Sequence, residues 1–341
     1  MGIINQKDGD SMKKLFLVLS MCLLFTGCGK YSSGDAQKDL EKKLENTSNY
    51  QLVGEMEIVN NDDVYKYDVD VSYSKTDKFR VSLKNKTNNH EQIILKNEDG
   101  VYVLTPALNK SFKFQSDWPY NNSQVYLLQT LLADIQNDNK KEFKETTNNY
   151  IFTTTVNYPN NSDLTHQKIY FDKKMNPSKV EVLNKDNDVL IKMTFKKCDM
   201  KAKFNNKYFT LDNNMKVSKD DTIIEDVSKL DSDIYPMYVP ENTKLADKQT
   251  INLDNGQRVI MTFEGDNPFM LAYQTAGVSD DSATVSMYGD PYQMAMGVAA
   301  VSDNMVSWVS NGIEYYVVAD NMSESELVNV ASSVSVIPVG K

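Results

Sequence analysis

The sequence has few of the residues on which most enzyme active sites depend. It contains two histidines, His90 and His166, and three cysteines in 341 residues. Both histidines stand beside polar residues in expected loops or strand edges. The sequence therefore has too few histidines in suitable places to build a Ser-His-Asp triad or a histidine-rich metal site. The sequence also has no Gly-x-Ser-x-Gly elbow, phosphate-binding loop or His-Glu-x-x-His motif. We therefore predict a protein that is not an enzyme and needs no metal or cofactor.

The scarcity of cysteine excludes an intramolecular disulfide from the mature chain. Cys22 and Cys28 belong to the N-terminal segment, which leaves Cys198 as the remaining thiol. Cys198 lies in an alternating stretch and is expected to be half-buried in a strand. An intermolecular disulfide through this thiol is the alternative, so a homodimer stays open.

Long apolar runs are absent except near the N-terminus. Leu15 to Phe25 gives eleven uncharged residues after the basic Met12-Lys13-Lys14. At roughly 1.5 Å per residue a helix of this length reaches about 17 Å, well short of the roughly 30 Å hydrocarbon core of a bilayer. The layout is typical of a cleaved secretory signal over residues 1–27.

Phe25-Thr26-Gly27-Cys28 resembles the bacterial lipobox, in which a small residue precedes a cysteine that becomes the acylated N-terminus. The resemblance implies a diacylglycerol on Cys28, followed by a short spacer over residues 28–34. Two acyl chains form a stable tether where one binds marginally. We expect a protein anchored on the outer face of the cell membrane. An ordinary cleaved signal is the alternative.

Negative charge is concentrated near the C-terminus. Residues 241–341 carry 4 basic and 13 acidic side chains, a net −9 of the total −10, which leaves net −1 for residues 1–240. Nucleic acid is therefore not expected as a partner. A charged, proline-containing stretch over residues 220–240 is expected as a linker between a domain at 35–219 and an acidic α+β domain at 241–341.

The first domain alternates between strand and helix patterns. The spacing of apolar residues predicts helices over Asp35–Glu45, capped by Asp35, and over Asn121–Gln136, capped by Asn121 or Asn122. Between and after them, short alternating runs separated by turns predict ten or eleven antiparallel strands. Tyr65–Tyr73 is the clearest, with apolar and polar residues on opposite faces. Together they indicate one large curved sheet whose concave face is covered by the helices.

The second domain is expected to hold short strands and a final helix. Its helix begins at a capping box, Ser323-Glu324-Ser325-Glu326, ahead of apolar residues at helical spacing. The strands are expected at Leu245–Leu253, Gln257–Phe263, Phe269–Gln274, Thr284–Tyr288, Val306–Val309 and Glu314–Ala319.

Several stretches resemble a known family. They are Tyr67–Tyr73 with Asp77–Val81, Asn97–Tyr102, Leu108–Phe114 and Trp118-Pro119-Tyr120. They resemble the LolA/RseB-like lipoproteins, and within that family the spore-associated lipoproteins of the GerS and YdcC type from clostridia and bacilli. The resemblance implies an α+β fold, with a curved antiparallel half-barrel under a helical lid, followed by a small α+β domain. It also implies a role in spore maturation or germination through a protein partner such as a cortex amidase, with the spore envelope as an alternative location to the cell membrane.

An aromatic and apolar cluster at the expected mouth of the half-barrel is the candidate groove for a ligand or partner. Its members are Trp118, Tyr120, Tyr126, Leu127 and Leu131. Plain core packing between helix and sheet is the alternative for these residues.

Three functions stay open from the sequence. The first is an anchored binding module with a protein partner. The second is a carrier or sensor of a hydrophobic ligand, such as acyl chains or lipoproteins, in a LolA-like groove. The third is an extracytoplasmic enzyme that uses paired carboxylates.

Overall fold

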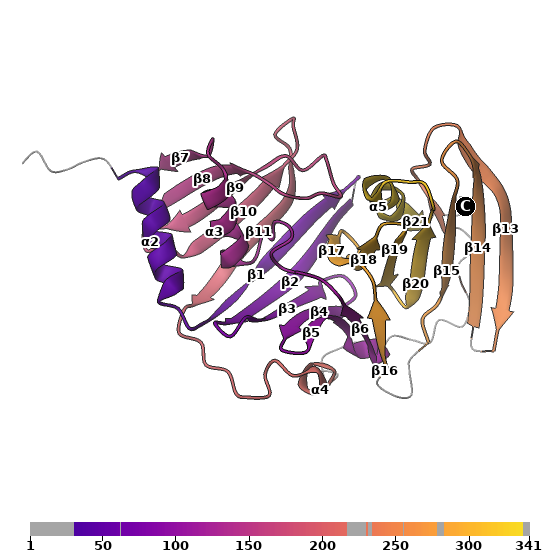
Figure 1. Ribbon diagram of the computed structural model, residues 1–341, viewed down its shortest axis with the longest axis horizontal. Helices are drawn as coiled ribbons and strands as arrows, with labels where there is room; N and C mark the ends of the chain where they lie inside the picture. Colours follow the sequence, from indigo (N-terminus) through magenta and orange to yellow (C-terminus); the bar gives the residue numbers. More distant parts are fainter. Residues whose placement is uncertain are drawn as a thin grey trace, which may run out of the picture.

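The computed structural model describes residues 31–61, 63–216, 230, 234–254, 256–277 and 283–336. The predicted signal segment and Cys28 lie outside these residues. Two large sheets stand beside each other along the long axis of the molecule, with helices at their faces (Figure 1).

The first sheet has 12 strands in the order β16-β6-β5-β4-β3-β2-β1-β11-β10-β9-β8-β7. All neighbours are antiparallel except β16 and β6, which run parallel. The strands are β1 Asn49–Asn60, β2 Asp63–Ser74, β3 Lys78–Asn85, β4 Glu91–Asn97, β5 Gly100–Thr105, β6 Lys110–Phe114, β7 Glu142–Glu145, β8 Asn149–Thr155, β9 His166–Asp172, β10 Pro177–Leu183, β11 Val189–Asp199 and β16 Ala283–Met287. A one-turn helix, η1 (Pro106–Leu108), joins β5 to β6. The predicted α+β class and the curved antiparallel sheet are confirmed.

Alternation along β2 places one set of side chains in the core. Tyr67, Val69 and Val71 are at most 3% exposed, whereas the neighbouring Lys66 and Asp68 on the opposite face are exposed. Because side chains alternate across a strand, this pattern fixes the register of β2 against β1 and β3. The predicted amphipathic strand is confirmed.

The opposite face of this sheet is not entirely exposed to solvent. Residues 204–216, which include the short helix α4 (Leu211–Asn214), pack on β4 and β5 around a second apolar cluster. The Ser72 hydroxyl lies 2.9 Å from that of Tyr208, which explains why Ser72 is fully buried. The segment that follows β11 is therefore part of the fold.

Helices α2 (Ser33–Glu45) and α3 (Leu128–Asn137) pack against each other and against the β7–β8 side of the first sheet. The predicted cap of α2 is wrong, since Ser32 is the N-cap. Asp35 instead occupies the third helical position, where its carboxylate accepts from the Ser32 backbone and side chain.

The predicted start of α3 is also wrong, because residues 121–127 are not helical. Side chains there are committed elsewhere. The Ser123 hydroxyl donates to Asp134 and accepts from the Asn157 backbone, while Gln124 donates to the Asn122 side chain. Leu127 takes the N-cap position and gives no side-chain hydrogen bond. Polar contacts, some of them to residues far along the chain, therefore hold this stretch in an irregular, turn-containing conformation up to the helix.

The second sheet has seven antiparallel strands in the order β13-β14-β15-β20-β19-β18-β17. The strands are β13 Thr243–Leu253, β14 Gly256–Gly265, β15 Phe269–Thr275, β17 Asp290–Met294, β18 Gly297–Ser302, β19 Met305–Ser310 and β20 Ile313–Val318. Helix α5 (Glu324–Ser332) packs on β18, β19 and β20, and β12 (Ile234–Pro236) pairs with β21 (Val334–Val336). The capping box of Ser323 and Glu326 is confirmed.

Two contacts of the C-terminal region tie the sheets together. Strand β16 was expected among the strands of the second domain, but it extends the first sheet beside β6. Lys110 of β6 forms an ion pair with Glu314 of β20, and both side chains are largely buried. The last hundred residues therefore contribute directly to the first sheet.

Candidate functional site

The concave face of the first sheet is covered from two directions. Leu128, Leu131 and Ile135 of α3 are fully buried against one half. The other half receives the turn between β17 and β18, which belongs to the second sheet (Figure 1). The cover is thus a helical lid on one side and a β-hairpin on the other.

The β17–β18 hairpin is held on the first sheet by hydrogen bonds and by close approach. The Tyr67 hydroxyl donates to the Ala295 carbonyl at 2.6 Å, and the Val298 amide donates to Gln92 Oε1 at 2.8 Å. Gly297 has φ of +140°, and a Cβ there would lie 2.5 Å from Gln92 Oε1. Glycine is favoured at this point because other residues rarely adopt this backbone conformation, and a Cβ would also displace the Gln92 amide from its hydrogen bond with Val298.

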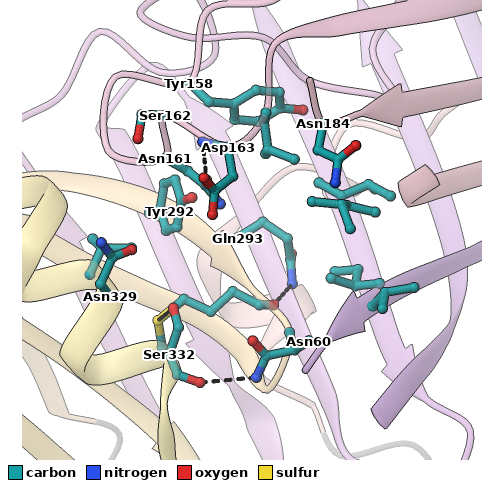
Figure 2. A pocket seen from close by; sticks show the side chains of 18 of the residues that line it. Asn60, Tyr158, Asn161, Ser162, Asp163, Asn184, Tyr292, Gln293, Asn329 and Ser332 are labelled. Atoms are coloured by element: carbon teal, nitrogen blue, oxygen red, sulfur yellow. Dashed lines mark hydrogen bonds between the residues drawn. The ribbon is translucent and has the colours of Figure 1, made fainter. Parts of the chain in front are cut away.

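A cavity of about 710 Å³ lies between the lid and the hairpin. Its walls come from the end of β1, the stretch before α3, the β8–β9 loop, the β10–β11 turn, the start of the β17–β18 hairpin and the end of α5. Figure 2 shows Asn60, Asn161, Asp163, Gln293 and Asn329 around this space. Both sheets build it, and its volume is in the range of ordinary ligand sites.

The lining is rich in uncharged polar groups. Of 28 lining residues, eight are Asn or Gln, four are Tyr and three are Ser, against ten apolar residues. The three charged residues, Asp163, Lys185 and Asp186, are all exposed at the rim. The inner wall is therefore neutral, and hydrogen-bonding groups alternate there with apolar surface.

Two polar atoms of the inner wall are left without a partner. Tyr126 is 1% exposed, and neither its hydroxyl nor Gln293 Oε1 has a hydrogen-bond partner within the described residues. The amide nitrogen of Gln293 donates to the Met294 carbonyl at 2.7 Å, so this side chain is fixed in place. A buried polar atom without a partner costs about 1–3 kcal/mol. Both atoms are closed off from solvent, so a ligand reaches them when the neighbouring side chains shift, and the missing hydrogen bonds favour that shift.

Two titratable groups near the cavity are shifted by burial. Burial raises the pKa of Tyr292 to about 12, against an opposing hydrogen bond to Asn161. Burial also raises the pKa of Asp134 to about 6, although the carboxylate accepts from Ser123 at 3.0 Å and from Gln167 at 2.6 Å. Asp134 thereby ties the lid to β9 and to the stretch before α3.

The predicted groove residues do not share one surface. Trp118, Tyr126, Leu127 and Leu131 are at most 1% exposed and belong to the core of the first sheet. Tyr126 also lines the cavity, whereas the other three do not appear in its wall. Tyr120 is 54% exposed and stands at the end of the sheet near Phe79.

Tyr120 is held rigidly although it is exposed. Its hydroxyl donates to Asp77 at 2.8 Å, the Lys96 ammonium lies 4.7 Å from its ring centre, and Lys96 pairs with Asp77 at 2.9 Å. The ring of Phe79 meets it edge-on. Burial, and next the hydrogen bond to Asp77, raise the pKa of Tyr120, so its phenol stays neutral at physiological pH. The result is an exposed aromatic group with little conformational freedom left to lose.

Other predicted groups are placed as follows. Cys198 lies half-buried in β11 as a free thiol, as predicted, and burial raises its pKa. His90 and His166 are both half-buried. Within the described part of the chain, no three His, Cys, Asp or Glu side chains gather in a way that could hold a metal ion.

None of the described helices has the length and apolar character to span a bilayer.

Sequence reasoning missed most of the cavity wall. Nothing in the sequence marked Tyr158, Asn161, Gln293 or Asn329 as parts of a site. The strands β17 and β18 were not predicted at all. Their alternation is weak because β18 is buried along nearly its whole length. Gly297 followed by an apolar run was the one available hint of a tight hairpin.

Fold and site together define the class, an α+β protein whose curved sheet is closed on its concave face over a neutral polar cavity. The model of the family "Sporulation protein YdcC-like" matches residues 12–209. The chain is 35% identical over 333 residues to the sporulation protein YdcC of Bacillus subtilis, covering 96% of this chain and 98% of that protein. The chain therefore belongs to the YdcC-like sporulation protein family, which confirms the resemblance to that type.

Two solved complexes are also similar to this chain at low identity. The complex of MucA and MucB from Pseudomonas aeruginosa matches at 11% identity with a TM-score of 0.33, over 89% of this chain and 99% of that one. The structure of the CwlD amidase from Clostridioides difficile in complex with the GerS lipoprotein contains a chain that matches at 17% identity with a TM-score of 0.30. This match covers 52% of this chain and 98% of that one.

Proposed function

We propose that this protein is a lipid-anchored binding module that acts in spore maturation or germination through a protein partner outside the membrane. Membership of a sporulation protein family supports the process. The lipobox-like Thr26-Gly27-Cys28 supports the anchor, and a cortex amidase is the partner that the sequence resemblance implies. The observation that carries the proposal is the exposed, immobilised ring of Tyr120.

Exposed aromatic side chains in fixed conformations are typical centres of protein interfaces. The hydrogen bond from Tyr120 to Asp77 and the cation from Lys96 fix the ring before any partner arrives. Binding then loses little side-chain entropy, and a large amphipathic surface becomes buried. We therefore assign Tyr120 to the partner surface.

Tyr170 offers a matched control on the same sheet. Its hydroxyl donates to Glu181 at 2.9 Å, Lys179 lies 4.1 Å from its ring centre, and Lys179 pairs with Glu181 at 2.6 Å. The chemical setting copies that of Tyr120, but Tyr170 lies on β9 and is half-buried. If replacing a tyrosine that is held by a carboxylate and a lysine acted only by disturbing the fold, changes at Tyr120 and at Tyr170 would have equal effects.

The test places a photo-crosslinking phenylalanine analogue at position 120 or at position 170 in sporulating cells. We expect a specific crosslinked protein from position 120 and none from position 170. An excess of the parent chain supplied in trans should remove that product, whereas an excess of Tyr120→Ala should leave it in place. Purified amidase is mixed with both derivatives as a second arm. Equal products from both positions, or none from either, would overturn the proposal.

The anchor is tested separately. Cys28→Ala is expected to abolish labelling with radioactive palmitate and to release the protein from the membrane fraction, because the diacylglycerol has no other attachment site in the lipobox. A variant that keeps both its label and its membrane association would contradict the anchor and leave the partner surface unaffected.

A further inference from the structure

We infer that the cavity between the lid and the β17–β18 hairpin binds an uncharged oligosaccharide. The inference goes beyond the partner surface at Tyr120 and does not depend on it. It rests on the lining of the cavity, on its two unpaired polar atoms and on the placement of its charges.

The amide side chains of the lining favour a ligand that carries many hydroxyl groups. Each amide offers an acceptor oxygen and a two-hydrogen donor on one rigid group, whereas each sugar hydroxyl both donates and accepts. Eight amides line this cavity, among them Asn161, Gln293 and Asn329. Tyr158 and Tyr238, the two lining tyrosines that keep exposed surface, add flat apolar faces with a polar end, which suits the C–H faces of a pyranose ring.

The inner wall disfavours an acyl chain. Asn122, Gln124 and Tyr126 are each less than 10% exposed, and all three line the cavity. Gln124 already donates to Asn122, but an alkyl chain would leave the Tyr126 hydroxyl without a hydrogen bond, at a cost of about 1–3 kcal/mol. In addition, side chains of α3 and of the hairpin fill the concave face beside it. The ligand must therefore carry its own donors and acceptors.

The charges and the backbone disfavour other polar ligands. Anions and cations need buried partners of opposite sign, but the charged residues of the lining, Asp163, Lys185 and Asp186, stand at the exposed rim. A peptide strand is commonly bound along a free sheet edge. The strand end that lines this cavity, residues 56–60 of β1, is paired on one side with β2 and, up to Ile58, with β11 on the other. A neutral sugar chain meets neither obstacle.

Two buried tyrosines give a sharp pair of variants. The Tyr126 hydroxyl has no partner in the described residues, whereas the Tyr50 hydroxyl donates to Gln129 at 2.6 Å. Tyr126→Phe should leave the fold as stable as before, or more stable, while weakening sugar binding. Tyr50→Phe should destabilise the fold and leave binding unchanged. A merely structural role of these tyrosines would not separate the two readouts in this way.

The experiment titrates the purified mature chain with chitotetraose and with cellotetraose by isothermal calorimetry, with palmitate and a neutral tetrapeptide as further arms. We expect saturable binding of at least one sugar. Affinity should fall about five- to tenfold in Tyr126→Phe, the value of one hydrogen bond, and by more in Gln293→Leu. Gln249→Leu, at an exposed position of β13, is the control and should bind as the parent does.

Comparison of the two affinities tells whether the cavity contacts the acetamido groups of chitotetraose, which cellotetraose lacks. Saturable binding of either sugar supports the inference. Binding of palmitate or of the peptide without sugar would overturn it. No binding of either sugar at millimolar concentration, or binding that survives in Gln293→Leu, would also overturn it. None of these results bears on crosslinking at Tyr120.

Discussion

The two sheets differ in where their cores come from. Among the described residues, every buried member of the second core lies at Ile234 or beyond, so that region supplies its own cover through α5. The first core includes Ala295, Val298 and Ala300, which follow its last consecutive strand by about a hundred residues. The dependence therefore runs in one direction. The C-terminal region completes the first sheet, and the cavity exists only where the two meet.

Exposure shows the same contrast from outside. Nine of the eleven residues of β13, at the free edge of the second sheet, are exposed. The hairpin at the other edge, β17–β18, is mostly buried, with Ala295, Val298 and Ala300 in the first core and its other buried apolar residues in the second. The two edges of one sheet thus have different roles, since one faces solvent and the other closes the neighbouring fold.

The largest effect is expected where the ion pair joins the sheets. Lys110→Met leaves Glu314 largely buried without its cation, which should lower the free energy of unfolding by about 3–4 kcal/mol. Lys66→Met, at an exposed pair with Glu57, should cost less than about 1 kcal/mol. Urea denaturation of both variants measures the difference, and equal losses would show that the junction is not special.

The helical half of the cover is tested through pH. The folded pKa of Asp134, about 6, lies above its ordinary 3.8, so the fold disfavours the ionised form. The stability of the parent should therefore fall relative to Asp134→Asn as pH rises from about 4 to 6, and the gap of about 2–3 kcal/mol should persist above that range.

Asparagine can keep both contacts of Asp134. Its amide oxygen accepts from Ser123, and Gln167 can turn its side-chain oxygen, which has no partner in the described residues, toward the new donor. Thermal unfolding of parent and variant between pH 4 and 8 gives the profile. A variant that is less stable than the parent at pH 7.5 would contradict the assignment.

The hairpin half of the cover is tested at Gly297. A Cβ at this position meets Gln92, and φ of +140° is unfavourable for alanine, so Gly297→Ala should cost about 2 kcal/mol. In helix α2, by contrast, Gly34→Ala meets nothing closer than 3.8 Å and should be neutral or slightly stabilising. Denaturant midpoints of the two variants should move apart; a harmless Gly297→Ala would mean that the hairpin is not closely docked.

The smallest effect is expected within the second region alone. Ser323→Ala removes the hydroxyl that accepts from the Glu326 amide at 3.3 Å, and should cost about 1 kcal/mol. Because α5 covers the second core, hydrogen exchange should quicken in α5 and β19 before it does in β2. If hydrogen exchange in β2 quickened by the same amount, the prediction that the effect stays within the second region would be wrong.

Local patterns predicted the parts of the fold that local forces determine. The alternation of Tyr65–Tyr73, the capping box at Ser323 and the half-buried Cys198 all follow from neighbouring residues. The start of α3 was mispredicted because Ser123 bonds to Asp134 and to the backbone of Asn157, contacts that sequence spacing does not reveal.

The candidate site was harder to predict than the fold. Tyr120 was placed in a groove with Trp118, but the Trp118 ring is buried and the Tyr120 ring, two residues later, is exposed. The cavity wall draws on segments as far apart as Asn60 and Ser332, joined by a hydrogen bond of 2.9 Å. Such pairings are set by tertiary packing, which no single stretch of the sequence encodes.

Native-state hydrogen exchange tests most directly whether the C-terminal region completes the first sheet. Peptides from β3–β4 and from β17–β18 should exchange with the same high opening free energy, because the Tyr67 and Gln92 side chains bind the hairpin to the sheet, whereas β13 should exchange early. If the β17–β18 peptide exchanged as early as β13 while β3–β4 stayed protected, the shared core would be contradicted.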